Sequence, residues 1–172
     1  MARRILLTSF APWKAHHRGN SSDQLLAEIT QIPTLSRSLY CLRYLPVNLP
    51  VSRDIIIAKL EQIQPDLVVC CGMAESRSQL NVEAQAVVNN VVLATRLNLK
   101  QLTFGLNHTV ISYDAGRFVC NSLYHAMLNY LKSCAPYQNG LFVHVPLLTA
   151  HNREPIAVDF RQLLERLLTL DH

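Results

Sequence analysis

Short apolar runs recur along the chain and predict strands that are buried on both faces. Three of these runs cover residues 3–10, 66–72 and 141–145. They are apolar almost throughout, which is typical of the inner strands of a parallel sheet. A fourth strand is predicted over 38–47, where apolar and polar residues alternate, and a short fifth strand over 110–113.

Four other segments carry apolar residues at helical spacing. The first helix is predicted over 23–32, directly after two serines that can cap its first turn. The second begins at Ser52 and ends before Pro65, because the residue before a proline disfavours the helical conformation. The last two helices are predicted over 120–132 and 154–170.

The order of these elements predicts the fold class. Strands that alternate with helices of about 10–15 residues indicate an α/β sandwich with a largely parallel sheet. No internal repeat, low-complexity tract or linker interrupts the pattern, so we expect residues 1–172 to form one domain. Sites in such sheets lie at the carboxyl ends of the strands.

Composition narrows the class of protein further. Hydrophobic residues make up 49% of the 172 residues and charged residues 16%, which argues against a disordered or fibrous chain. The net charge of +4 comes without a basic cluster, so we expect no nucleic-acid partner. No apolar run approaches the roughly 18 residues that a membrane span needs. The apolar run after Arg3 and Arg4 is too short for a signal peptide, so we expect a cytoplasmic protein without a membrane partner.

The cysteine and histidine pattern gives no sign of a disulfide framework or a metal site. The five cysteines include no pair spaced as CxxC: Cys41, Cys70, Cys71, Cys120 and Cys134. Some histidines are conceivable ligands, but their spacing fits no ligand pair on one helix and no set of thiols accompanies them: His16, His17, His125 and His151. We therefore expect no metal and no cofactor.

Three reactive groups lie where strands of the predicted sheet end. Cys120 stands at the start of a helix, where free backbone N–H groups and the helix dipole lower a thiol pKa. His144 lies at the end of a strand, and Glu83 follows the strand 66–72. A nucleophilic thiol, a base and an orienting carboxylate are the parts of a catalytic triad. From spacing alone, ordinary packing of the cysteine and the histidine is the favoured interpretation.

The residues around these three groups carry a resemblance to a known family. Residues 115–121 read A-G-R-F-V-C-N and resemble A-G-T-F-V-C-N, the nucleophile motif of the pyroglutamyl peptidase I family, also called pyrrolidone-carboxylate peptidases. Residues 142–146, F-V-H-V-P, are similar to the family's F-I-H-V-P around its catalytic histidine. Residues 72–83 resemble G-Q-A-G-G-R-x-x-I-x-x-E, with the spacing kept without a gap. The resemblance covers most of the chain, in order.

The resemblance implies a cysteine exopeptidase that acts on a small peptide with a blocked N-terminus. Cys120 would attack the carbonyl after an N-terminal pyroglutamate, His144 would act as the base, and Glu83 would orient His144. Arg77 matches the family arginine that helps to stabilise the oxyanion. Phe10 matches an aromatic residue that packs on the pyroglutamyl ring, and Trp13 falls where the family has a second one. The implied fold is a three-layer α/β/α sandwich with a largely parallel, mixed sheet of the phosphorylase/hydrolase-like type.

The sequence also departs from the family pattern. Residues 87–107 occupy the place of a longer family segment that contains D-A-R-I-P-D and helps to form the substrate side and subunit contacts, so we expect a monomer or a weak homo-oligomer. Glu75 and Ser76 replace two glycines, and a pairing of Glu75 with Arg77 would compete with oxyanion stabilisation. Asp114 and Arg117 are charged where the family is not, so they could pair, or Asp114 could compete with Glu83 for His144.

These departures keep two other functions open. The same triad could act on a different N-terminal acyl or amide group through a more open site. Alternatively, the chain could be a catalytically impaired homologue that serves as a binding module.

Overall fold

The computed structural model describes residues 3–17 and 19–169. Over these residues a six-stranded mixed sheet has the strand order β2–β1–β3–β8–β4–β7. Its strands are β1 (Ile5–Phe10), β2 (Leu39–Leu45), β3 (Leu67–Met73), β4 (Leu80–Glu83), β7 (Thr109–Ser112) and β8 (Asn139–Val145). Neighbouring strands from β2 to β8 are parallel, β4 runs antiparallel to β8, and β7 is parallel to β4.

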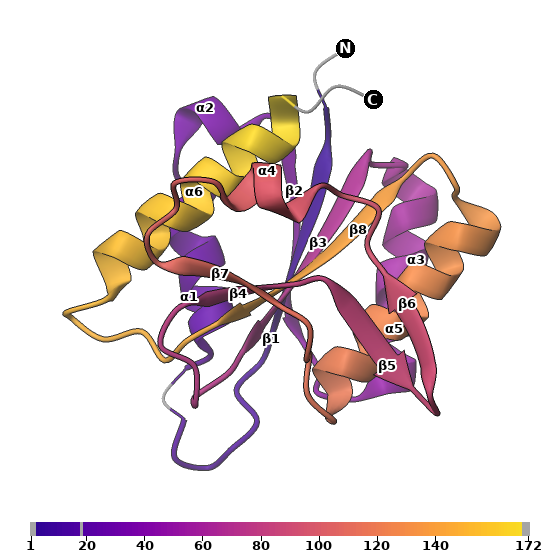
Figure 1. Cartoon of the computed structure of the whole chain (residues 1–172), viewed down its shortest axis with the longest axis horizontal. Coiled ribbons are helices and arrows are strands. Elements are labelled where there is room, and N and C mark those ends of the chain that lie inside the picture. Colours follow the sequence, from indigo (N-terminus) through magenta and orange to yellow (C-terminus); the bar gives the residue numbers. More distant parts are fainter. Residues whose placement is uncertain (1–2, 18, 170–172) are drawn as a thin grey trace.

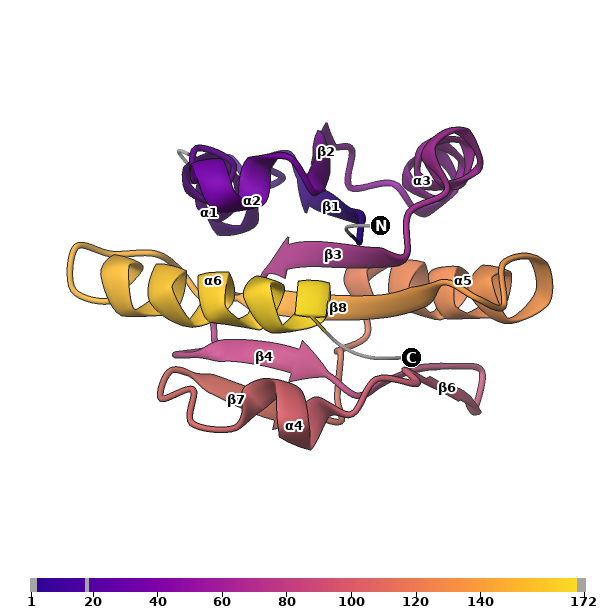
Figure 2. The same cartoon turned by 90° about the horizontal axis from the view of Figure 1, so that it is seen from above.

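Helices cover both faces of this sheet (Figures 1 and 2). One face carries α1 (Ser21–Ile29), α2 (Pro33–Ser36), α4 (Leu99–Thr103) and α6 (Arg153–Thr169). The other face carries α3 (Leu49–Ile63) and α5 (Val119–Cys134). The expected three-layer α/β/α sandwich with a largely parallel sheet is therefore confirmed.

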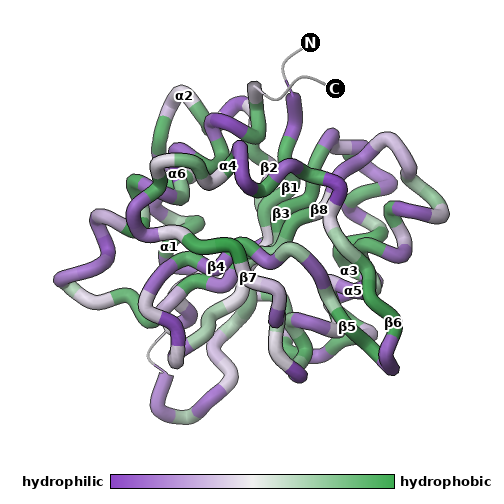
Figure 3. The backbone as a smooth tube through the Cα atoms, in the orientation of Figure 1, coloured by the Kyte–Doolittle hydropathy of each residue, from purple (hydrophilic) through white to green (hydrophobic). Residues whose placement is uncertain are grey.

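Two hydrophobic cores explain why the inner strands read as continuous apolar runs. Successive side chains of a strand point to opposite faces of the sheet. Leu67 and Val69 of β3 accordingly belong to the core beneath α1 and α6, whereas Val68 and Cys70 belong to the core beneath α3 and α5. Hydrophobic residues follow one another along β1, β3 and β8 in Figure 3. Both faces of these strands exclude water, so neither face needs polar residues.

Two predicted helices begin earlier in the structure than in the sequence-based assignment. In α1 the capping residue is Asn20, whose side chain accepts a hydrogen bond from Ser22 N at 3.0 Å. In α3 Asn48 caps in the same way, accepting from Val51 N at 3.1 Å, and Pro50 is tolerated in the first turn. Ser52, the predicted start, instead donates its hydroxyl to Pro46 O at 2.5 Å.

A hairpin of β5 (Gln85–Val88) and β6 (Val91–Ala94) packs beside α5 and was not predicted from the sequence. Its turn residues Asn89 and Asn90 have φ of 48° and 64°, the conformation of a two-residue hairpin turn that asparagine tolerates. Asn121 of α5 binds the hairpin through two hydrogen bonds. Its side-chain amide accepts a hydrogen bond from Val87 N at 3.0 Å and donates one to Val87 O at 2.7 Å. The residue after Cys120 is thus tied to this hairpin.

Within the described residues, every helix is too short or too polar to cross a bilayer.

Candidate active site

A cavity of about 420 Å³ opens where β1, β3 and β8 end. Five of the six residues singled out in the sequence line it: Phe10, Trp13, Arg77, Cys120 and His144. Phe10 is buried, whereas Trp13 is 48% exposed at the mouth. The sixth residue, Glu83, lies behind His144 and contacts the cavity only through that imidazole.

His144 and Glu83 form a buried hydrogen-bonded pair. Nδ1 of His144 lies 2.7 Å from Oε1 of Glu83, and the two residues are 6% and 0% exposed. Glu83 pairs with Phe142 across the antiparallel strands, so its side chain lies on the same face as Phe142 and His144, two residues further along β8. With Nδ1 bound to the carboxylate, Nε2 is the imidazole nitrogen left for chemistry.

The direction of β4 corrects one expectation from the sequence. From the sequence, Glu83 follows the strand 66–72 and Cys120 follows the strand 110–113, and both were expected at one edge of the sheet with His144; Glu83 lies instead on the unpredicted strand β4. That expectation is wrong for β4 and β7, which run opposite to β8. Glu83 reaches His144 as a cross-strand neighbour, and the chain returns from the end of β7 through residues 113–118 before Cys120 enters the cavity.

Cys120 is the second residue of α5, and its thiol rests against the backbone of β3. A Cβ atom at Gly72 would lie 2.8 Å from Cys120 Sγ and 3.0 Å from a ring carbon of Phe142. Gly72 pairs in register with His144 on the neighbouring strand. The absence of a side chain at Gly72 therefore makes the space in which the thiol lies next to the strand that carries the histidine.

Burial raises the pKa of the Cys120 thiol to about 12, although the backbone N–H of Cys120 itself acts in the opposite direction. The expectation that the start of the helix lowers this pKa is therefore wrong, because removal of the thiol from water outweighs the local dipole. Among the described residues, no hydrogen bond joins Cys120 to His144. The thiol at rest is neutral and requires a base before it can attack a carbonyl.

Arg77 is held at the edge of the cavity by the loop that precedes α5. Its Nη2 donates to the carbonyl oxygen of Asp114 at 3.0 Å. The Asp114 carboxylate accepts from Gly116 N at 2.9 Å, so it closes a turn. Neither the suggested pairing of Asp114 with Arg117 nor a contact of Asp114 with His144 occurs within residues 3–17 and 19–169.

Glu75 does not pair with Arg77, contrary to one of the possibilities raised by the sequence. Its carboxylate accepts from Lys14 Nζ at 3.0 Å and from the imidazole of His17. These hydrogen bonds lower the pKa of Glu75 to about 2. Lys14 Nζ also lies 4.5 Å from the centre of the Trp13 ring. Within the described part of the chain, no carboxylate therefore pairs with the guanidinium of Arg77.

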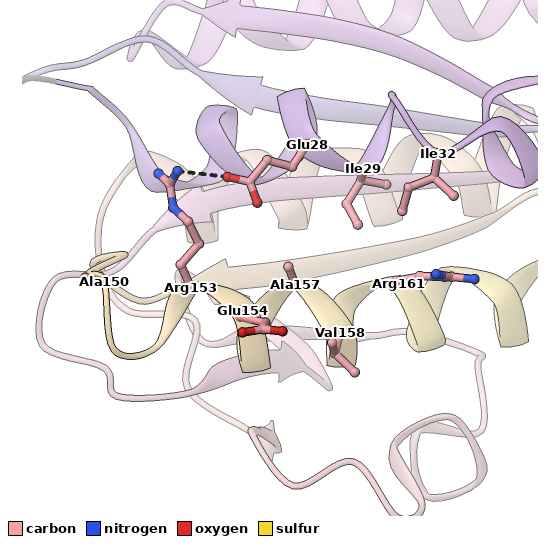
Figure 4. Close-up of a pocket in the computed structure, with 9 residues that line it drawn as sticks. All are labelled: Glu28, Ile29, Ile32, Ala150, Arg153, Glu154, Ala157, Val158 and Arg161. Carbon is pink, nitrogen blue, oxygen red and sulfur yellow. Dashed lines mark ion pairs between the residues drawn. The ribbon is translucent and has the colours of Figure 1, made fainter.

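A second hollow, of about 450 Å³, lies between α1 and α6 and holds none of the predicted site residues. Figure 4 shows apolar side chains such as Ile29 and Ala157 along it and the ion pair of Glu28 with Arg153, 3.0 Å apart, at one end. No thiol, histidine or hydroxyl side chain lines it. Its reactive groups are carboxylates and guanidiniums without an imidazole or thiol beside them, so the cavity around Cys120 is the candidate active site.

Solved structures of bacterial peptidases share this fold. Pyroglutamyl peptidase I from Bacillus amyloliquefaciens superposes with a TM-score of 0.85 over 99% of this chain and 97% of that chain, at 18% identity. The pyrrolidone carboxyl peptidase from Fervidobacterium islandicum has a TM-score of 0.81 at 20% identity, over 96% and 98% of the two chains. The class is therefore an α/β protein with the architecture of these peptidases.

Sequence comparison identifies the family within that class. The profile of the family described as Pyroglutamyl peptidase matches residues 3–98, which is more than half of the chain. The chain belongs to this family, and the resemblance seen in the motifs is confirmed. The pyrrolidone-carboxylate peptidase of Bacillus subtilis is 27% identical in an alignment that covers 86% of this chain and 80% of the relative. The profile match includes Arg77 and Glu83 but ends before Cys120 and His144.

Proposed function

We propose that this protein is a cysteine peptidase that releases an N-terminal pyroglutamyl residue, with Cys120 as nucleophile, His144 as general base and Glu83 as the residue that orients His144. The observation that carries the proposal is the buried His144–Glu83 pair at the wall of the cavity that also holds Cys120. Membership of the pyroglutamyl peptidase family supports the substrate.

Because the Cys120 thiol is neutral, it must lose its proton in the same step in which it attacks the substrate. Cys120 Sγ forms a bond to the carbonyl carbon of the pyroglutamyl residue while its proton passes to Nε2 of His144. The carbonyl electron pair moves onto oxygen. When it returns, the C–N bond breaks, and the imidazolium gives its proton to the leaving amine. Water then attacks the resulting thioester with His144 again as base, which releases pyroglutamate and restores the thiol.

Glu83 and Arg77 would stabilise the two charges that develop during these steps, on the imidazolium and on the oxyanion. Glu83 accepts the hydrogen bond from Nδ1, so the neutral imidazole keeps its lone pair on Nε2 and the imidazolium is stabilised once it forms. The oxyanion would be met by the Cys120 backbone N–H at the start of α5 and by Arg77. One Arg77 N–H is bound to Asp114, and the guanidinium has further donors.

The aromatic part of the cavity suits an uncharged ring. Pyroglutamate carries a lactam in place of a free amino group, so its binding requires no buried carboxylate partner. Phe10 offers a buried ring face, and Trp13 offers a second, half-exposed one at the mouth. We propose that these two residues contact the substrate ring and the part of the peptide that follows it.

Hydrolysis of a fluorogenic pyroglutamyl amide tests this function. We expect release of the fluorophore by the wild-type chain, its loss in Cys120→Ser and in His144→Ala, and its retention in Cys134→Ser, which alters an exposed cysteine on the far end of the same helix. The corresponding prolyl amide, which has the same ring size without the lactam carbonyl, should not be hydrolysed.

Two other outcomes point to the alternatives. Hydrolysis of acetyl or other acyl amides at rates equal to that of the pyroglutamyl amide would indicate the same triad with another substrate. Saturable binding of a pyroglutamyl peptide without any hydrolysis would indicate an impaired homologue that acts as a binding module. Activity that persists in Cys120→Ser would refute the assigned nucleophile.

A further inference from the structure

Three possible metal ligands meet at the mouth of the cavity, outside the proposed triad. His16 and His17 belong to the loop after β1, and Glu75 belongs to the loop after β3. One ligand atom from each residue lies within 4.8 Å of the other two. His17 and Glu75 are separated by 58 positions in the sequence, so the fold and not a local motif brings this cluster together.

One distance in this cluster is close to the spacing of ligand atoms around a transition-metal ion. A tetrahedral zinc ion with bonds of about 2.0–2.1 Å to nitrogen and oxygen holds its ligand atoms roughly 3.3 Å apart. His16 Nε2 lies 3.6 Å from Glu75 Oε1, and His17 Nε2 contacts the same carboxylate oxygen. Small adjustments of side chains on two surface loops would bring all three atoms to one ion.

The buried state of His17 is the second observation. Its side chain is 4% exposed, yet among residues 3–17 and 19–169 Nδ1 has no hydrogen-bond partner and Nε2 has only the Glu75 carboxylate. An imidazole held this way costs desolvation without full hydrogen bonding. An ion bound at Nε2 would replace the contact with Glu75 and leave Nδ1 as it is, but it would find the imidazole already held with Nε2 toward the carboxylate.

We propose that His16, His17 and Glu75 form a binding site for one divalent transition-metal ion of the zinc type. Two imidazoles and one carboxylate leave a further coordination position for water or another small ligand. Lys14 holds the second oxygen of Glu75 at 3.0 Å and thereby fixes the direction in which the first oxygen faces the imidazoles. This site is separate from the proposed catalytic function and does not depend on it.

The position of the site defines what a bound ion would do to the protein. Trp13, Lys14 and Glu75 all line the cavity, so the ion would lie at its mouth. It would also join the loop after β1 to the loop after β3. Because a ligand that binds only the folded state stabilises it, the ion raises the melting temperature of the protein.

Zinc and cobalt binding to chain prepared without a polyhistidine tag tests the site. When the protein competes with a chromophoric chelator for Zn²⁺, we expect it to bind one ion per chain. Zn²⁺ should also raise its melting temperature. His16→Gln and Glu75→Gln each should raise the Kd by about tenfold or more, since loss of even an outer-shell partner costs about 10–100-fold. Both residues are on the surface, and the unchanged melting temperature of the metal-free variants verifies folding.

The controls separate this site from the thiols and from other histidines. His151→Gln removes an exposed histidine from another loop, and Cys120→Ser removes the proposed nucleophile; both should bind Zn²⁺ as the wild type does. Co²⁺ should give the absorption of a nitrogen and oxygen site without a thiolate charge-transfer band. The proposal is overturned by substoichiometric binding, by full affinity in a His16→Gln/Glu75→Gln double variant, by a thiolate band, or by loss of binding in Cys120→Ser.

Discussion

Two groups of histidine and carboxylate border the same cavity and differ in how the fold holds them. Glu83 and His144 lie on adjacent strands, with both side chains removed from water and a single hydrogen bond between them. Glu75 lies on a loop, with its side chain 33% exposed, and is approached by Lys14, His16 and His17. The first group has one partner in one geometry, whereas the second has several partners around one carboxylate.

Under the two proposals above, burial and strand pairing, more than residue type, would separate two uses of the same chemistry. A carboxylate fixed by a sheet can hold an imidazole in one tautomer, as a general base requires. A carboxylate on a loop can exchange partners and shift slightly, as a ligand to a metal ion requires. Four predictions test this contrast, beginning with the largest effect.

Replacing Glu83 by Gln should reduce kcat/KM for a pyroglutamyl amide by about 10⁴-fold, the effect of the equivalent loss in serine peptidases. The amide keeps the shape of the side chain but no longer holds the base in the required tautomer or stabilises the imidazolium. Steady-state kinetics measure the loss, and Glu165→Gln, which alters an exposed ion pair on α6, is the matched control. A decrease in kcat/KM of less than tenfold would contradict the proposed functional difference between the Glu83–His144 pair and the group around Glu75.

Replacing Gly72 by Ala should reduce kcat/KM by about 100-fold, because a displacement of about 1 Å at a reacting atom has that effect. The added methyl would lie 2.8 Å from Cys120 Sγ and must displace the thiol. Gly140→Ala is the matched control on neighbouring β8, where the methyl would meet Leu131 at 2.7 Å, away from the cavity. Both variants should lose about 1–3 kcal/mol of stability from overpacking, but only Gly72→Ala should lose activity.

A third carboxylate, Asp23, sharpens the comparison because its partner is an arginine and its role is structural. Asp23 accepts two hydrogen bonds from Arg43 at 2.8 and 2.7 Å and one from Ser9 at 2.7 Å, which connects α1, β2 and β1. Burial alone would raise its pKa, but these hydrogen bonds outweigh burial and lower it. Asp23→Asn should cost about 1–3 kcal/mol of unfolding free energy at neutral pH.

The sign of the pH dependence follows from the lowered pKa of Asp23. Its contribution to stability is present above the unfolded pKa of about 3.9 and is lost as the pH falls through the lower folded value. Urea unfolding of wild type and Asp23→Asn from pH 7 to pH 2.5 should therefore converge in acid. Asp54→Asn, at an exposed ion pair on α3, should stay within about 0.5 kcal/mol of wild type throughout. A constant difference between Asp23→Asn and wild type would contradict the assignment.

The smallest expected effect concerns the alkylation of Cys120 in the absence of substrate. Because burial raises its pKa to about 12, the rate of reaction with iodoacetamide should rise about tenfold per pH unit between pH 7 and 10 without a plateau. His144→Ala should change this rate little, since no hydrogen bond joins the two residues within the described part of the chain. Measurements use a Cys134→Ser background. A plateau near neutral pH would instead identify a preformed thiolate.

The sequence predicted those parts of the fold in which apolar patterning is strongest. The strands β1, β3 and β8 are largely apolar because both of their faces are buried, and α5 and α6 show helical periodicity. The strands β4 to β7 have four residues each and were mostly missed, because so short a segment carries little pattern of its own. The direction of β4, which brings Glu83 to His144, depends on pairing with β8 and has no local signal.

For the candidate site, motif identity predicted which residues gather but not their physical state. Cys120, His144, Arg77, Phe10 and Trp13 were all singled out, and all line one cavity. The pKa of Cys120 was predicted to be lowered but is raised, because the sequence around Cys120 does not show that the thiol packs against Gly72. The partners of Glu75 were missed for a related reason: His16 and His17 come from another loop, and their spacing along the chain gave no sign that a carboxylate lies beside them.

The antiparallel pairing of β4 with β8 also makes enzymatic activity a reporter of folding order. Glu83 and His144 are 61 positions apart, and a slip of one residue in the β4–β8 register would turn Glu83 toward the opposite face of the sheet. A refolding chain could collapse, form its helices and pair its parallel strands while this register is still wrong. Recovery of activity after dilution from denaturant should therefore follow, and never precede, the recovery of helical circular dichroism.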